Sequence, residues 1–359
     1  MKWALFLCLF VLVACAKPTT FGNSVSQTNL TSIFPIEYGG NPALLTYSSD
    51  LKQVSLETVT EGKLQEITSA AAIGNVWGAS TLKVDNAERI AVAYGYGRGD
   101  LSAPVRIVLY DQNLEHPETI FTAQSERSEV TFFGLVNDKL FINYFTDKYH
   151  TKGGYLDHAA GAWTFTETNT ERLGIHLAFD GDIEYIGRPY GDTLESDGDL
   201  LRVQGTQTMH LPTFRGVSSV ALAQLDDDPE QEILIGDGWH KNYGKLAEPR
   251  LSLVDRGTGE YTVRVIDTAK PQYAILQIIP IMVDEKTHVL ARGDLSIGLY
   301  DPEDGWKKQT VYQRTGDKFS PFGMAYLGQA EGQIQLAVLD GGLSLKQVAL
   351  SVRSSSGAP

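Results

Sequence analysis

A glycine-containing turn recurs along this chain at nearly constant spacing, and that repeat constrains the fold more than any other feature of the sequence. The clear copies begin at Gly99, Gly198, Gly293 and Gly341, and weaker copies begin at Gly39, Gly153 and Gly244. The successive intervals between these glycines are 60, 54, 45, 46, 49 and 48 residues. Internal periods of this length indicate that one small structural unit is repeated about seven times.

Each repeat is rich in short apolar strands. Strands that end in a second turn follow the glycine turns, as in Leu109-Tyr110-Asp111 and Leu299-Tyr300-Asp301. In the two most similar units, residues 90–92 align with 233–235 and residues 104–111 align with 249–255. Short strands bounded by Gly and Asp turns, with no convincing amphipathic helix, predict an all-β chain.

Units of 45 to 50 residues that hold about four strands are typical of the blades of a β-propeller. We therefore predict a single propeller domain over residues 33–353, with seven blades preferred over six. A two-sheet sandwich or a β-helix is the alternative fold. The last unit ends near Val352 after its third strand, so we expect the ring to close with a strand borrowed from residues 23–38. Residues 354–359 are expected to form a disordered tail.

The first residues have the features of an export signal. Lys2 precedes an apolar run over residues 3–14, which is shorter than the roughly 20 residues that span a bilayer. The run ends in Leu12-Val13-Ala14-Cys15, which resembles the lipobox of bacterial lipoproteins. That resemblance implies a signal peptide over residues 1–14, attachment of fatty acids such as palmitate to Cys15, and a membrane anchor. The alternative is an ordinary signal peptide that is cleaved after Ala14 or Ala16.

Residues 15–32 are predicted to be the lipidated cysteine and a polar tether. Ala16 stands where an Asp resembles the inner-membrane retention signal of enterobacterial lipoproteins, so the resemblance implies the outer membrane of a bacterial cell envelope. The second cysteine, Cys8, lies within the signal peptide, so the mature chain has no disulfide and no free thiol nucleophile.

The charge balance excludes one class of partner. The chain has 44 Asp and Glu residues against 30 Lys and Arg residues, which gives a formal net charge of -14. Nucleic-acid binding depends on a basic surface, because release of counterions by Lys and Arg supplies most of its affinity. We therefore expect no nucleic-acid partner, and the anionic surface of a membrane would also repel the body of this chain.

Residues 220–236 contain an acidic loop between two apolar strands, and they resemble the FG-GAP or VCBS repeat of bacterial propellers and integrin heads. In that family, acidic residues at alternating positions of the loop bind calcium, which prefers six to eight oxygen ligands. The resemblance implies a degenerate calcium site formed by Asp226, Asp228 and Glu232, with Gln224 in place of the first Asp of the family pattern. An acidic turn without a metal is the alternative.

Aromatic residues gather in the long connections of the two most similar units. We predict a shallow ligand-binding surface formed by Tyr94, Tyr96, Trp239, His240 and Tyr243. Aromatic side chains with a polar tip suit surfaces that are partly exposed to water. The alternative is that these side chains pack one blade against the next.

Other motifs are better explained by structure than by chemistry. Arg-Gly-Asp occurs at 98–100 and at 292–294, but both copies continue with Leu-Ser and occupy the same position of the repeat. Gly and Asp are common in turns, so integrin adhesion is disfavoured. The seven histidines lack the spacing of a zinc site, and no Gly-x-Ser-x-Gly motif is present. No catalytic residue is predicted.

We therefore interpret the chain as a lipid-anchored envelope protein whose propeller is a non-catalytic binding module for a protein or a carbohydrate, with calcium as its one candidate cofactor. Two alternatives remain open. One is an envelope polysaccharide lyase or hydrolase with an axial active site, and the other is a scaffold in outer-membrane assembly. A fold of this kind does not by itself decide between them.

Overall fold

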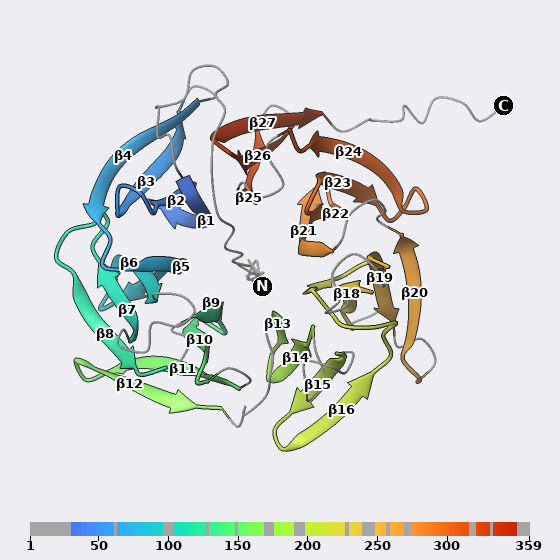
Figure 1. Ribbon diagram of the computed structural model, residues 1–359, viewed down its shortest axis with the longest axis horizontal. Coiled ribbons are helices and arrows are strands. Elements are labelled where there is room, and N and C mark those ends of the chain that lie inside the picture. The colour runs from blue at the N-terminus through green and yellow to red at the C-terminus, as the bar shows by residue number, and fades with distance from the viewer. Residues whose placement is uncertain are drawn as a thin grey trace.

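The computed structural model describes residues 30–60, 63–95, 104–125, 129–147, 150–168, 176–189, 198–226, 230–238, 248–255, 259–268, 274–315, 321–330 and 333–349. These residues form seven antiparallel sheets arranged as the blades of a closed ring (Figure 1). The all-β propeller with seven blades is therefore confirmed, and the alternatives of six blades, a sandwich or a β-helix are wrong.

The first three blades follow one another along the chain and have four strands each. Blade 1 contains β1 (Leu30–Tyr38), β2 (Asn41–Ser48), β3 (Gln53–Thr60) and β4 (Lys63–Ala71). Blade 2 contains β5 (Asn75–Val84), β6 (Ala87–Gly95), β7 (Val105–Tyr110) and β8 (Glu118–Ala123). Blade 3 contains β9 (Val130–Val136), β10 (Lys139–Phe145), β11 (Thr151–Ala159) and β12 (Ala162–Glu167).

The remaining four blades continue the same order, and only the last differs in its number of described strands. Blade 4 contains β13 (His176–Asp180), β14 (Ile183–Gly187), β15 (Leu200–Gln204) and β16 (Gln207–Leu211). Blade 5 contains β17 (Ser219–Ala223), β18 (Glu232–Asp237), β19 (Arg250–Asp255) and β20 (Thr262–Asp267). Blade 6 contains β21 (Ile275–Val283), β22 (Lys286–Gly293), β23 (Ser296–Asp301) and β24 (Lys307–Gln313). Blade 7 contains β25 (Phe322–Ala330), β26 (Gln333–Asp340) and β27 (Leu343–Ala349).

Within each blade, the first strand lies nearest the centre of the ring, and the following strands lie progressively farther out in chain order (Figure 1). Second strands are buried on both faces because a neighbouring blade packs against each face, and they therefore read as continuous apolar runs. All six residues of β18 are buried, whereas β24, an outer strand, is mostly exposed. The core thus consists of apolar clusters between successive blades.

Tight hairpins connect the first strand to the second in most blades. Blade 1 uses Gly39-Gly40, blade 2 uses Asp85-Asn86 and blade 6 uses Asp284-Glu285, and both central residues of each pair have positive φ. Two-residue loops of this conformation match the right-handed twist of the strands. We call the end of the ring that carries these hairpins the short-turn face. The opposite end carries the links from second to third strands and from blade to blade, and we call it the long-connection face.

The predicted turns do not all occupy the same position of the blade. The turns near Gly198, Gly293 and Gly341 do link a second strand to a third, as the regular spacing indicated, but Gly39 belongs to the first hairpin and Gly153 lies inside β11. The true equivalent in blade 1 is the turn at Asp50. Gly99 and Gly244 lie outside the described residues.

The predicted closure of the ring is also wrong in its described part. Blade 7 ends after its third strand as expected, but residues 30–38 form β1, the inner strand of blade 1, and not a fourth strand of blade 7. Residues 23–29 and 354–359 lie outside the described residues. Blades 1 and 7 close the ring by packing an apolar cluster that includes Ile33, Leu44, Ala325 and Leu339.

Candidate functional site

The long-connection face carries the longest links of the ring. Nine residues (96–104) separate β6 from β7, and twelve residues separate β14 from β15 (188–199) and β18 from β19 (238–249). Functional residues are frequently carried by loops that a rigid scaffold positions. This face is therefore the candidate functional site, and the described residues at the bases of its links show how it is built.

The predicted aromatic surface falls largely on these links. Tyr96, Trp239, His240 and Tyr243 lie outside the described residues, so their ligand-binding role stays a prediction. Tyr94 is fully buried between blades 1 and 2, and its hydroxyl oxygen lies 2.9 Å from that of Tyr110. Burial raises the pKa of Tyr94 far above its ordinary value, and Tyr110 adds to the shift. Tyr94 therefore matches the alternative of packing between blades.

An arginine, an aspartate and a histidine meet at the link of blade 4. Arg188 donates from Nε to Oδ1 of Asp199 at 2.5 Å and from Nη2 to Oδ2 at 2.8 Å. His210 on β16 places Nδ1 2.7 Å from the same Oδ2. The arginine side chain is 12% exposed and the histidine side chain is 68% exposed. A paired arginine therefore fixes the carboxylate, which in turn holds the imidazole at the surface.

Blade 5 ends its second strand on a buried carboxylate. Asp237 has no exposed surface, and it accepts hydrogen bonds from the Ser252 hydroxyl at 2.9 Å and from the Phe214 backbone N–H at 3.0 Å. Burial raises the pKa of Asp237, and these hydrogen bonds oppose the shift. The Phe214 ring, which is 43% exposed, lies 4.2 Å below the guanidinium carbon of Arg250. Asp237 thus fixes the link that presents this aromatic ring.

Two more buried charges lie between blades 6 and 7. Arg292 on β22 is 2% exposed and Asp340 at the end of β26 is 8% exposed. Asp340 accepts hydrogen bonds at Oδ2 from the Tyr312 hydroxyl at 2.9 Å and from the Thr315 backbone N–H at 2.8 Å. Its Oδ1 lies 3.7 Å from Nε of Arg314.

The same face of blades 1 to 3 is built from neutral groups in its buried described positions. Ser48 ends β2 and accepts a hydrogen bond from the Leu51 N–H at 3.3 Å, and Asn143 donates to the Thr131 hydroxyl at 2.6 Å. Leu51 itself is 59% exposed, and Ile73 in the next link is 39% exposed. The difference between the two halves therefore concerns their buried strand ends, because the links of both halves expose charged as well as apolar side chains, such as Asp147 and His150 in blade 3 and Phe214 after blade 4.

The predicted calcium loop lies at the short-turn end of blade 5, and the structure describes only part of it. Asp228 is outside the described residues, Asp226 is exposed and Glu232 is buried. Oε2 of Glu232 accepts a hydrogen bond from the Leu225 N–H at 2.7 Å, and the Gln224 amide donates to the Asp226 carbonyl at 2.8 Å. Glu232 therefore organises the loop from within, and calcium binding stays a prediction.

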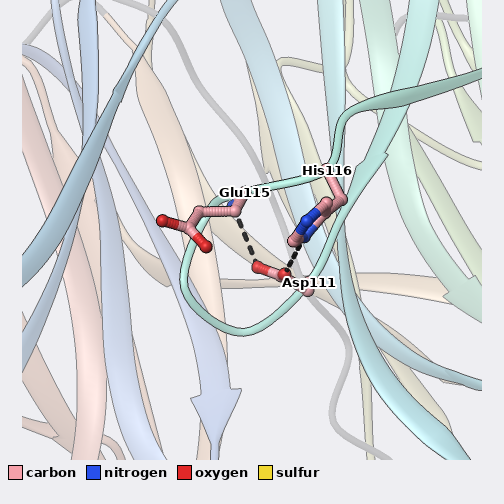
Figure 2. A group of neighbouring side chains, drawn as sticks. All are labelled: Asp111, Glu115 and His116. Atoms are coloured by element: carbon pink, nitrogen blue, oxygen red, sulfur yellow. Dashed lines mark hydrogen bonds and ion pairs between the residues drawn. The ribbon is translucent and has the colours of Figure 1, made fainter.

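A second group of metal-ligating residue types lies on the turn between β7 and β8, where Asp111, Glu115 and His116 have ligand atoms within 4.8 Å of one another (Figure 2). Asp111 accepts at Oδ1 from the N–H groups of Asn113 and Glu115, both at 2.9 Å, and its Oδ2 lies 2.7 Å from His116 Nδ1. Both carboxylate oxygens are thus used to form the turn. These hydrogen bonds account for the grouping as part of the turn.

The charged residues of blades 4 to 7 were not predicted as site residues, although the sequence contains a signal for some of them. Asp199, Asp237 and Asp294 each follow a glycine at one or the other end of the link from second to third strand. In the sequence, turn formation was a sufficient explanation for these Gly-Asp pairs. The structure adds that Asp237 is fully buried and that Asp199 contacts both Arg188 and His210.

The predicted anchor residue Cys15 lies outside the described residues. Within the described residues, no helix has the length and apolar character needed to cross a membrane.

No protein-family model matches this chain, and no curated protein matches it. Solved structures do resemble it. Sqt1 of Saccharomyces cerevisiae has a TM-score of 0.54 and 10% sequence identity, covering 88% of this chain and 95% of Sqt1. A chain in the S. cerevisiae assembly of Dbp5 with Nup159, Gle1, IP6 and ADP has a TM-score of 0.53 and 10% identity, covering 87% of this chain and 88% of its own length. At this identity the resemblance shows the propeller fold and nothing further.

Proposed function

We propose that this chain is a lipid-anchored protein of the bacterial cell envelope, and that its propeller is a non-catalytic module that binds a protein partner through the long-connection face. The observation that carries the proposal is the difference between the two ends of the ring. Most strands at the short-turn face are joined by two-residue turns, although blade 5 has an eight-residue loop there (224–231). The long-connection face carries the longest links, and the two twelve-residue links, in blades 4 and 5, adjoin the fixed charged residues Asp199 and Asp237.

The described part of the long-connection face has the mixed chemistry of a protein-binding surface. Leu51, Ile73 and Phe214 are large apolar side chains exposed in its links. His210 and Arg250 add polar and charged groups that are held by Asp199 and Glu248. Aromatic and arginine side chains are enriched in protein interfaces, and groups that are held in place lose less entropy on binding.

A similar propeller fold is also found in an assembly of several proteins, since the S. cerevisiae structure that contains Dbp5 and Nup159 holds such a chain. This similarity supports protein binding as a use of the fold. A carbohydrate ligand is the second outcome, and it would involve the aromatic residues Trp239 and Tyr243, which the sequence places in one of the two twelve-residue links.

Photo-crosslinking tests the choice of face. A photoreactive phenylalanine analogue at Phe214 reports on the long-connection face, and the same analogue at Met282, which is 58% exposed near the hairpin of blade 6, is the matched control. We expect one discrete protein adduct from position 214 and none from position 282. Adducts of equal yield from both positions would refute the assignment of the face.

The anchor has a separate test. Cys15→Ala is expected to move the full chain from the membrane fraction to the soluble fraction, because the acyl chains supply the attachment. A Cys8→Ala variant is the control and should stay with the membrane. Membrane retention of Cys15→Ala would contradict the lipoprotein assignment without affecting the crosslinking result.

A further inference from the structure

Arg292 is a buried cation at the interface between blades 6 and 7. It is 2% exposed, and its Nε donates to Oε1 of Gln277 at 3.3 Å. The amide nitrogen of Gln277 donates in turn to the Met324 carbonyl at 3.1 Å, which fixes its orientation. Among the described residues, the two terminal nitrogens of Arg292 have no hydrogen-bond or ion-pair partner. Burial of a charged group without a counter-charge is costly, so buried charges are normally paired.

A second arginine lies beside the first. The guanidinium carbons of Arg292 and Arg314 lie 5.6 Å and 5.3 Å from the centre of the Phe322 ring. Burial and the charge of Arg314 lower the pKa of Arg292 to about 10, and Asp294 opposes that shift. Arg292 therefore still carries its positive charge at neutral pH.

The nearby acidic groups balance only part of this charge. Asp340 faces Arg314, with 3.7 Å between Oδ1 and Nε, and its other oxygen accepts hydrogen bonds from Tyr312 and Thr315. Asp294 is half-buried and raises the pKa of Arg292, yet it forms no ion pair with that guanidinium in the described structure. Among the described residues, the Arg292 guanidinium thus has no carboxylate within ion-pair distance, and Asp294 acts on it only from farther away.

We propose that Arg292, with Arg314 beside it, binds a small carboxylate at the long-connection end of this interface. A carboxylate is planar and carries one charge, so it matches both the two free donors of a guanidinium and the single charge to be balanced. A phosphate would bring more negative charge than the one guanidinium that lacks an ion pair, Arg292, because Arg314 already faces Asp340. The proposal is independent of the partner proposed above, since it concerns a small anion.

The negative net charge of the chain helps to distinguish acetate binding at this site from general attraction of anions. The formal net charge is -14, so the molecule as a whole repels anions, and general anion accumulation does not explain a stabilising response. A ligand that binds only the folded state raises its melting temperature with concentration.

The test is thermal unfolding of the purified full chain in sodium acetate, sodium phosphate and sodium chloride at equal ionic strength. We expect acetate at about tenfold excess over its Kd to raise the melting temperature by about 3 °C above the chloride value. Phosphate should give a smaller rise. A response to acetate no larger than to chloride, or a larger response to phosphate, would overturn the proposal.

Variants assign the response to the residue. Arg292→Met keeps the length of the side chain and removes its charge, so it should lose the acetate response, while Arg292→Lys should keep part of it. Arg250→Met is the matched control, because Arg250 also lies over a phenylalanine ring on this face but is paired with Glu248 at 2.7 Å. An acetate response that persists in folded Arg292→Met would contradict the site.

Discussion

The long-connection face is built in two different ways on the two sides of the ring. In blades 5, 6 and 7 the second strand ends on or beside a buried charged residue, namely Asp237, Arg292 and Asp340. In blades 1 and 3 the described equivalents are neutral, with Ser48 and Phe145 at these strand ends. The core between blades is apolar on both sides, so the fold alone does not require these charges. The difference supports our proposal that blades 4 to 7, which we call the charged half, bind a partner in addition to packing the ring.

Blade 1 also contains one buried carboxylate, which is an exception to this comparison. Its removal should have the largest effect on stability. Glu57 on β3 is 4% exposed and accepts a hydrogen bond from the Thr46 hydroxyl at 3.1 Å. Side chains alternate along a strand, so Glu57 shares the side of Val59, which packs in the cluster between blades 1 and 7. Burial raises its pKa to about 7, the Thr46 hydrogen bond opposes the shift, and Glu66 adds to it.

Because the folded-state pKa is above the unfolded value of 4.5, protonated Glu57 stabilises the fold fully below pH 4.5, and this stabilisation is lost as pH rises to about 7. The difference between a pKa of 4.5 and one of about 7 corresponds to about 3 kcal/mol. Glu57→Gln should remove this loss and be more stable than the wild type at pH 8, measured by urea unfolding from pH 4.5 to 8. Glu66→Gln is the control, with a much smaller change. Equal pH profiles for wild type and Glu57→Gln would show that Glu57 is not the titrating group.

Mutation of the residues that end the second strands compares the stability that the two halves gain there. Asp237→Ala leaves the Phe214 N–H and the Ser252 hydroxyl without their acceptor, and it should lower the free energy of unfolding by about 2 kcal/mol or more. Ser48→Ala at the equivalent end of β2 removes one hydrogen bond to Leu51 and should cost about 1 kcal/mol or less. Urea unfolding of both variants measures the difference. Equal losses would mean that the two halves are held together in the same way.

The smallest effect is expected on the short-turn face. The hydrogen bond to Asp111 raises the pKa of His116, and the charge of Asp111 adds to it. Asp111→Asn should therefore return the His116 pKa toward its ordinary value, as followed by the ring-proton chemical shifts in NMR. Because His116 is exposed, global stability should change little. A His116 pKa that is unchanged in the variant would show that the turn does not hold this pair.

The repeat in the sequence was enough to predict seven blades and an all-β chain, because glycine turns and apolar strands are local features. The repeat did not predict where the first unit begins, because the glycines of the Gly39-Gly40 hairpin look in the sequence like a turn between a second and a third strand. The charged clusters were not predicted because they join residues that only the strand register brings together. Arg314, for example, follows β24 and meets Asp340 at the end of β26. Tyr94 was predicted to lie on the ligand-binding surface, because the sequence around a single aromatic residue does not show whether its side chain is buried.

We propose that the charged half of the long-connection face contacts a partner and does not merely stabilise the ring. His210 offers the most direct test, because its side chain is 68% exposed and is held by Asp199. The measurement is the yield of the crosslinked adduct from position 214 in a His210→Gln background, with the melting temperature of the same chain. We predict a several-fold loss of adduct with the melting temperature unchanged within about 1 °C. An unchanged adduct yield together with a lower melting temperature would contradict the claim.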